Sequence, residues 1–235
     1  IALTTITVPN TVMSIGSSAF SGCANITEIT LPFVGASRDA VGYSAQFGYI
    51  FGYTALEIST SYNSQHPVGS YDSKYYGYVF KNTYSANKGG NLGYYYNVII
   101  SYRSVPTSLK TVVISDATKI ETGAFDNYKN ITKIILNDGV ASIGDYAFRN
   151  SQIKDFVIPE SVTEIGTYAF YGCTGLMEMH IPNSVTKIKD YTFSNCTEIK
   201  RLTISRNAKA IDQYAFYNCS GISELVIPDK TETIG

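Results

Sequence analysis

Residues 153–173 read IKDFVIPESVTEIGTYAFYGC, and this stretch is one copy of a unit that recurs along most of the chain. The pair Ala169-Phe170 near its end marks the copies, with Thr192 replacing the alanine in one of them. From the second marked phenylalanine onward, the steps are 23, 22, 23 and 23 residues. The marked residues are Phe20, Phe125, Phe148, Phe170, Phe193 and Phe216. A fixed period of this length is the signature of a repeat architecture, so the repeat decides the fold.

The first half of each copy follows the pattern L-x-x-I-x-I-P. Alternation with period two among β-branched residues predicts a short strand whose isoleucines point inward. A following proline has no N–H to donate, so it ends the pairing. Eight such openings occur, with their last aliphatic residue at Val8, Leu31, Ile114, Leu136, Ile158, Ile181, Ile204 and Ile227.

The second half carries another apolar pair, such as Val162 and Ile165, and then the Ala-Phe turn. A residue able to cap a helical or 3₁₀ turn, such as Thr167, often stands three positions before the phenylalanine. One coil cannot bury both of its apolar faces, but stacked coils can. The repeat therefore predicts a mainly β solenoid with a parallel ladder at ~4.8 Å spacing and one continuous row of phenylalanines.

The full pattern, L-x-x-I-x-I-P-x-x-V-x-x-I-G-x-x-A-F-x-x-C, resembles the BspA-type leucine-rich repeat of bacterial surface proteins and some protists. It covers residues 1–32 and 109–235, roughly two-thirds of the chain. The resemblance implies a right-handed leucine-rich-repeat superhelix with short helical or 3₁₀ turns. It also implies a secreted or cell-surface protein used for adhesion, and it implies no chemistry.

The period stops between residues 33 and 108, a stretch that holds 13 of the 20 tyrosines. Such aromatic density argues for order, because disordered segments are poor in aromatics. Residues 75–80 and 94–100 have high β-propensity and flank a turn signal at residues 87–91, so we expect a hairpin. The opening of this stretch also resembles an island module of the same repeat family.

Three parts are therefore expected: leucine-rich repeats at 1–32, a Tyr-rich inserted β-rich island at 33–108, and the second part of the solenoid at 109–235. The ends of the island must rejoin adjacent coils. We therefore expect Leu31 and Ile114 to pair as strand neighbours across the insertion.

The composition and the histidines limit the function. The 235 residues include 18 basic and 19 acidic side chains, a net charge of −1, which argues against nucleic acid as a partner. No apolar run approaches the ~18 residues of a bilayer span, so no direct membrane insertion of this stretch is expected. His66 and His180 have no triad-like neighbours in sequence, so we predict no catalytic residue, no enzyme activity and no cofactor.

The four cysteines share one repeat position, three residues after the phenylalanine. Tyr128 and Ser151 fill the same position elsewhere, and spacings near 23 fit no zinc pattern, so no metal site is predicted. Buried free thiols are favoured. A disulfide between neighbours is the alternative, although side chains in register are poorly oriented for it. The cysteines are Cys23, Cys173, Cys196 and Cys219.

Two sets of residues are candidates for partner binding. Strand residues that alternate with the inward isoleucines point to solvent and form columns on the sheet face. These columns are either a solvated surface with compensating charges or a binding strip, and an apolar run within them favours the second. The sheet-face candidates are Val113, Lys133, Ile135, Asp155, Val157, Glu178, His180 and Arg201.

The second set consists of island tyrosines. Exposed tyrosine clusters make good contact surfaces for proteins or sugars. Equally, the island needs aromatic rings for a core of its own. These candidates are Tyr75, Tyr76, Tyr78, Tyr94, Tyr95 and Tyr96.

The sequence thus predicts a non-enzymatic, extracellular or cell-surface binding or adhesion protein. It would present the sheet face and the island to a host or neighbouring-cell protein or glycan. A structural spacer that displays another domain and a carbohydrate-binding module that uses the island aromatics are the alternatives. A signal, a surface anchor and further coils are expected outside this stretch.

Overall fold

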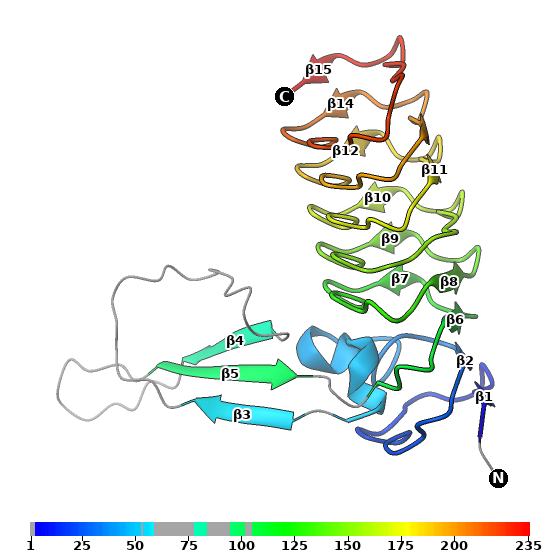
Figure 1. Ribbon diagram of the computed structural model, residues 1–235, viewed down its shortest axis with the longest axis vertical. Helices are drawn as coiled ribbons and strands as arrows, with labels where there is room; N and C mark the ends of the chain where they lie inside the picture. Colours follow the sequence, from blue (N-terminus) through cyan, green and yellow to red (C-terminus); the bar gives the residue numbers. More distant parts are fainter. Residues whose placement is uncertain (1–2, 53, 59–77, 84–94, 102–104) are drawn as a thin grey trace, which may run out of the picture.

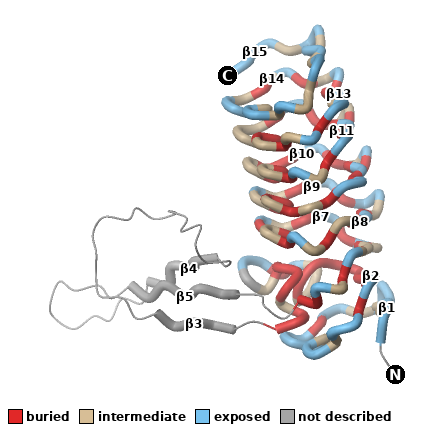
Figure 2. The backbone as a smooth tube through the Cα atoms, viewed as in Figure 1, coloured by how far each residue is buried: buried red, intermediate tan, exposed pale blue. Residues whose placement is uncertain are grey.

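The computed structural model describes residues 3–52, 54–58, 78–83, 95–101 and 105–235. The coils stack into one solenoid, and a small three-stranded sheet lies beside its N-terminal half (Figure 1). Figure 2 shows buried residues along the inside of the coils and exposed ones on their outer edges. The predicted solenoid is confirmed.

The L-x-x-I-x-I openings form the first parallel ladder. Four strands pair in the order β1-β2-β6-β8, and two more pair as β11-β13. Leu31 is paired with Ile114, so the ladder continues across the insertion as expected. The strands are β1 (Thr5–Thr7), β2 (Glu28–Leu31), β6 (Thr111–Ile114), β8 (Lys133–Leu136), β11 (Glu178–His180) and β13 (Arg201–Thr203).

The first ladder is interrupted between β8 and β11. In the coil between them, a single parallel bridge joins Lys133 of β8 to Asp155. The strand expected at 156–158 is absent, although the register is retained. Phe156 takes the inward position that an aliphatic residue fills in the neighbouring coils, and its ring lies 4.8 Å from that of Phe148. We attribute the local loss of pairing to this larger ring. The last opening, 222–227, has a neighbouring coil on one side only and also forms no strand.

From residue 119 onward, the second apolar pairs form two further parallel sheets of three strands each, which were not predicted from sequence. We call these two sheets together the second ladder. Its strands are two residues long, so no alternation could reveal them. Their isoleucines, from Ile120 to Ile211, are buried. The strands are β7 (Lys119–Ile120), β9 (Ser142–Ile143) and β10 (Glu164–Ile165), then β12 (Lys187–Ile188), β14 (Ala210–Ile211) and β15 (Thr233–Ile234).

The repeat phenylalanines stack in a single row through the core. The centroid distances are 5.5, 5.2, 5.2 and 5.9 Å along the series Phe125, Phe148, Phe170, Phe193 and Phe216, and the rings are tilted by at most 17°. Bonds of the 3₁₀ type close each turn, as in Arg149 N–H to Tyr146 O at 3.1 Å. The predicted row is confirmed.

Residues 33–52 contribute to the same core. The ring of Phe47 lies 5.2 Å from Phe125 and 5.4 Å from Phe51, which in turn lies 6.2 Å from Phe20. Phe20 N–H donates to Ile50 O at 2.8 Å, as successive coils do elsewhere. The 3₁₀ helices η1 (Gly42–Ala45) and η2 (Phe47–Ile50) therefore replace a coil turn within the row. From the loss of the repeat period alone, these residues are predicted to belong to the island.

The rest of the island contains an antiparallel sheet of order β3-β5-β4. The expected hairpin is confirmed for β4 (Tyr78–Thr83) and β5 (Tyr95–Ser101), whereas β3 (Thr54–Ile58) was not predicted. In the backbone register Tyr78 is opposite Ile100, Tyr95 opposite Thr83 and Tyr96 opposite Asn82. Tyr75, Tyr76 and Tyr94 lie outside the described residues.

All four cysteines are free thiols, so the disulfide alternative does not hold. The thiols of Cys173, Cys196 and Cys219 each donate to a phenylalanine carbonyl of the preceding coil at 3.0 Å. Burial raises the pKa of Cys173 to about 12 and also raises the pKa of Cys196.

We predict that Phe47→Ala destabilises the protein about as much as Phe170→Ala, by about 3–5 kcal/mol each. Both substitutions remove a fully buried ring from the same row. Denaturant unfolding of the two variants and the wild type measures the effect. A loss below about 1 kcal/mol for Phe47→Ala would show that residues 33–52 do not belong to the solenoid core.

We also predict that a thiol reagent at mildly alkaline pH modifies Cys23 first, then Cys219, and reaches Cys173 and Cys196 only after unfolding. The order follows from burial, because the reactive thiolate is disfavoured in the core. Mass spectrometry of the labelled peptides gives the rates with and without denaturant. Rapid native labelling of Cys173 would contradict the stacked-thiol arrangement.

Candidate interaction surface

The outward residues of the first ladder form one continuous surface, which we call the strand face. The register aligns Thr111, Lys133 and Asp155 in one column and Val113 with Ile135 in the next. Farther along the solenoid, Glu178 lies beside Arg201 and His180 beside Thr203. The alternation of side chains about a strand produces these columns because inward positions are filled by the core.

All eight sheet-face residues proposed from sequence lie on this strand face, and their role in binding stays a prediction. Two of them are unusual in being apolar and open to solvent, Ile135 at 42% and Val157 at 80% exposure. Arg201 Nη1 donates to Glu178 Oε1 at 2.8 Å, with both side chains mostly exposed. Such an exposed ion pair contributes about 0–1 kcal/mol to the stability of the fold. A binding partner could therefore replace this contact at little cost in free energy.

One column of charge beside this face was not predicted from sequence. In the coils of β6, β8 and Asp155, carboxylates stand two residues after the opening, at Asp116, Asp138 and Glu160, and we call this column the acidic rim. It borders the outward apolar residues Val113, Ile135 and Val157, which we call the apolar strip. On the other side of the strip the charges are mixed, because the register places Lys133 between Thr111 and Asp155. Extending the aligned repeats by two residues after each strand would have revealed the acidic rim.

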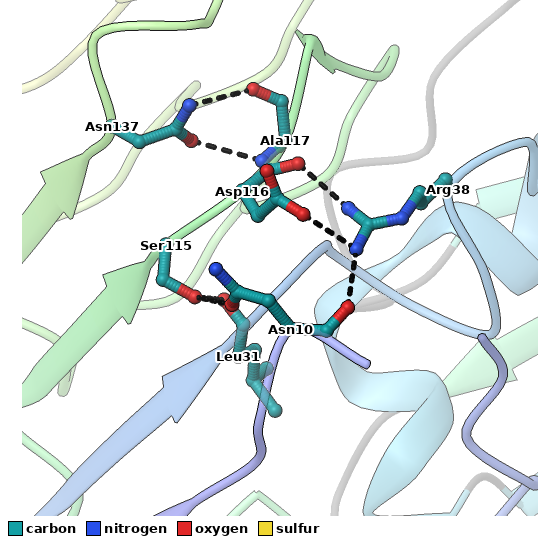
Figure 3. Close-up of polar contacts among 7 residues, drawn as sticks. All are labelled: Asn10, Leu31, Arg38, Ser115, Asp116, Ala117 and Asn137. Carbon is teal, nitrogen blue, oxygen red and sulfur yellow. Dashed lines mark hydrogen bonds and ion pairs between the residues drawn. The ribbon is translucent and has the colours of Figure 1, made fainter. Parts of the chain in front are cut away.

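A polar network fixes the N-terminal end of the acidic rim (Figure 3). Arg38 Nη2 lies 2.6 Å from Asp116 Oδ2 and also donates to Asn10 O at 2.9 Å. Ser115 Oγ donates to Asn10 Oδ1 at 2.7 Å. Asn137 bonds both the N–H and the carbonyl of Ala117, each at 2.9 Å. The network ties the first coil, the segment after β2 and the coil of β6 together, so this end of the strand face is held in place.

A stack of tyrosines runs along the Ala-Phe turns and was also missed. The rings of Tyr146, Tyr168, Tyr191 and Tyr214 are 5.2, 4.6 and 4.9 Å apart and nearly parallel. All four residues have positive φ, between 54° and 58°, which costs roughly 1–2 kcal/mol for a residue with a Cβ. Stacking offsets part of this cost. The recurrence of tyrosine two positions before the phenylalanine was the available signal.

A buried ion pair lies beside this stack. The side chains of Asp126 and Arg149 are 3% and 8% exposed, and Arg149 Nε donates to Asp126 Oδ1 at 2.9 Å. The guanidinium also lies 4.8 Å from the ring centroid of Tyr146. Burial lowers the pKa of Arg149 to about 10, which leaves it charged at neutral pH. Neighbouring rings cover each other's faces in the stack, so we regard it as structural rather than as a sugar platform.

The strand face and the island sheet lie on different sides of the solenoid (Figure 1). A small partner therefore cannot contact both, although the sequence analysis offered them together. A pocket beside Arg38 and Glu121 has a volume of about 10 Å³, which is room for about one water molecule. No helix among the described residues has the length and apolarity of a membrane span.

Stacked coils of about 23 residues with parallel ladders and an aliphatic and phenylalanine core define a leucine-rich-repeat solenoid. The family model of the BspA type leucine rich repeat region matches six copies, over residues 1–45 and 118–235. The chain belongs to this family, and membership suggests a protein-interaction role. No curated protein matches the chain.

One solved structure shares the fold, and two others show a weaker likeness. A leucine-rich repeat protein from Bacteroides ovatus ATCC 8483 is 21% identical with a TM-score of 0.60, over 98% of this chain and 49% of that one. The chain thus spans about half the length of that protein. A leucine-rich repeat protein from Eubacterium ventriosum ATCC 27560 is 20% identical with a TM-score of 0.42, over 99% of this chain and 81% of that one. A leucine rich cell surface protein from Faecalibacterium prausnitzii A2-165 is 16% identical with a TM-score of 0.37, over 99% of this chain and 69% of that one.

Proposed function

We propose that the chain is a non-enzymatic binding module of a cell-surface protein and that it docks a protein partner on the strand face. The observation that carries this proposal is the apolar strip on the outward side of three successive coils, with the acidic rim beside it. A spacer needs only a solvated surface, and a solvated surface has no reason to align apolar side chains in the open.

The physical properties of the strand face suit protein recognition. Burying Ile135 and Val157 against a partner would stabilise the complex by roughly 25 cal/mol per Å² of apolar area removed from water. The acidic rim would orient a partner that carries a basic surface and raise its association rate more than its affinity. The stacked coils hold these side chains on a rigid backbone, which lowers the entropy lost on binding.

The family resemblance to bacterial surface proteins supports an extracellular location and a host or neighbouring-cell protein as the partner. A structural spacer and a glycan-binding module that uses the island tyrosines are the alternatives proposed from sequence. The side chains of those tyrosines lie outside the described residues, so glycan binding stays a prediction.

We predict that the double variant Lys133→Glu/Val157→Asp loses capture of a surface-protein partner by at least about tenfold. It reverses the charge of Lys133 beside the apolar strip and places a charge on the strip itself, and a defect at the centre of an interface commonly costs more than 1.4 kcal/mol, which is tenfold in affinity. Capture from surface-protein extracts is quantified by mass spectrometry for each protein retained by the wild type.

The matched control is Lys209→Glu/Thr186→Asp, which makes the same change in charge at exposed positions beside the second ladder. Both variants must keep the circular dichroism spectrum and melting temperature of the wild type. Equal capture by the strand-face variant, the control and the wild type would rule out the strand face as the docking site.

A further inference from the structure

We propose that the tyrosine stack is a site of oxidative modification, at which hydrogen peroxide acting through a haem peroxidase joins neighbouring rings as dityrosine. Each link would fasten one coil covalently to the next. The stack lies along the Ala-Phe turns and not on the strand face, so the proposal is independent of the docking function. The tyrosines of the stack are Tyr146, Tyr168, Tyr191 and Tyr214.

The rings are arranged as two coupling phenols must be. Tyr168 and Tyr191 are the closest pair of the stack, with ring centroids 4.6 Å apart and ring planes 5° from parallel. Tyr191 and Tyr214 follow at 4.9 Å and 18°. These residues stand at equivalent repeat positions with nearly equal φ, so their side chains leave the backbone in the same direction. The carbons ortho to the two hydroxyls can therefore meet by rotation of the side chains.

Other tyrosine contacts in the described part of the solenoid are less suitable for joining coils. Tyr171 lies 5.5 Å from Tyr168 at an interplanar angle of 55°, and Tyr217 lies 5.7 Å from Tyr214 at 86°. In both pairs the rings are steeply inclined and belong to the same coil. A link there would not connect one coil to the next, so fastening of coil to coil is specific to the stack.

The backbone shows that the turn itself does not require tyrosine at these positions. All four residues of the stack have φ between 54° and 58°, which is unfavourable for a residue with a Cβ. Gly123 holds the equivalent position in the coil before Tyr146, with φ of 65°, and glycine adopts this conformation without steric cost. The chain thus places four phenols where a smaller residue would be accommodated more easily.

The phenols are accessible to an oxidant and carry the proton that oxidation releases. Tyr214 is 51% exposed, and the other three tyrosines are half-buried. Burial raises the pKa of Tyr146 and Tyr168, so these two phenols are protonated at neutral pH. Oxidation can begin at Tyr214 and pass inward, because electrons transfer readily between rings that are in contact.

The reaction balances with hydrogen peroxide as the only reagent consumed. Each tyrosine gives up one electron and one proton and becomes a neutral tyrosyl radical. Two neighbouring radicals combine through one carbon–carbon bond between their ortho carbons, and the hydrogen on each of these carbons is then transferred to a ring oxygen. One molecule of peroxide takes up the two electrons and two protons and gives two molecules of water. The peroxidase haem returns to its starting state.

A link between successive coils would stabilise the fold. Stacked tyrosines are 22 or 23 residues apart, so each link closes a loop of that length. Closing such a loop restricts the unfolded chain, as a disulfide of similar span does. The oxidised protein should therefore melt at a higher temperature than the untreated protein.

Oxidation of the intact 235-residue chain tests the proposal. The chain is treated with hydrogen peroxide and a haem peroxidase at low protein concentration, and the monomer is digested with trypsin. Residues 190–200 form a tryptic peptide whose one tyrosine is Tyr191, so its cross-links are assigned directly. Mass spectrometry should show this peptide joined at Tyr168 or Tyr214, with the loss of two hydrogen atoms at each link. A monomer in which Tyr191 stays unmodified while other tyrosines are linked overturns the proposal.

Two matched variants make the test specific. Tyr191→Phe keeps a ring in the stack but removes its phenol, so it should lose both links of residue 191 and most of the rise in melting temperature. Tyr171→Phe removes a phenol beside the stack, at the inclined contact with Tyr168, and should link like the wild type. Both variants should keep the circular dichroism spectrum of the wild type. Equal loss of linking in the two variants, or an undiminished rise in melting temperature for Tyr191→Phe, contradicts the assignment to the stack.

Discussion

Stacking of one phenylalanine ring on the next is the contact on which the rest of the structure depends. The inner rings of the row are buried because the coils on both sides cover their faces, as for Phe148 between Phe125 and Phe170. A single coil has no such cover and could not hide its aliphatic side chains either. The ring distances of 5.2–5.9 Å also keep the coils in register. Where the repeat is interrupted, Phe47 and Phe51 keep the row continuous.

The alignment of the surface residues depends on the constant register of the coils in this row. Because the register is constant, residues at equivalent repeat positions line up in columns, and a bias at one position becomes a stripe along the solenoid. A carboxylate two residues after the opening is unremarkable in any single coil. Repeated in three coils, it forms the acidic rim beside Ile135 and Val157. The proposed docking function follows from that arrangement.

Periodicity made the row, the inward isoleucines and the pairing of Leu31 with Ile114 predictable. Features without a period were not predictable. Phe47 and Phe51 sit among aromatic residues of an irregular segment, and their place in the core depends on contacts with distant coils. The second ladder has strands too short to alternate, and Phe156 disrupts a strand whose pattern looks regular. The sheet-face candidates lie where alternation put them, but the acidic rim lies in a column beyond the strands. The side chains of the candidate island tyrosines lie outside the described residues.

Double-mutant cycles on the phenylalanine row measure the central claim most directly. Phe148→Leu and Phe170→Leu remove two adjacent rings, whereas Phe148→Leu and Phe216→Leu remove rings three coils apart. Denaturant unfolding should give a coupling free energy of about 0.5–1.5 kcal/mol for the adjacent pair and additivity within about 0.5 kcal/mol for the distant pair. Additivity for the adjacent pair, or equal coupling for both pairs, would contradict a continuous stacked row.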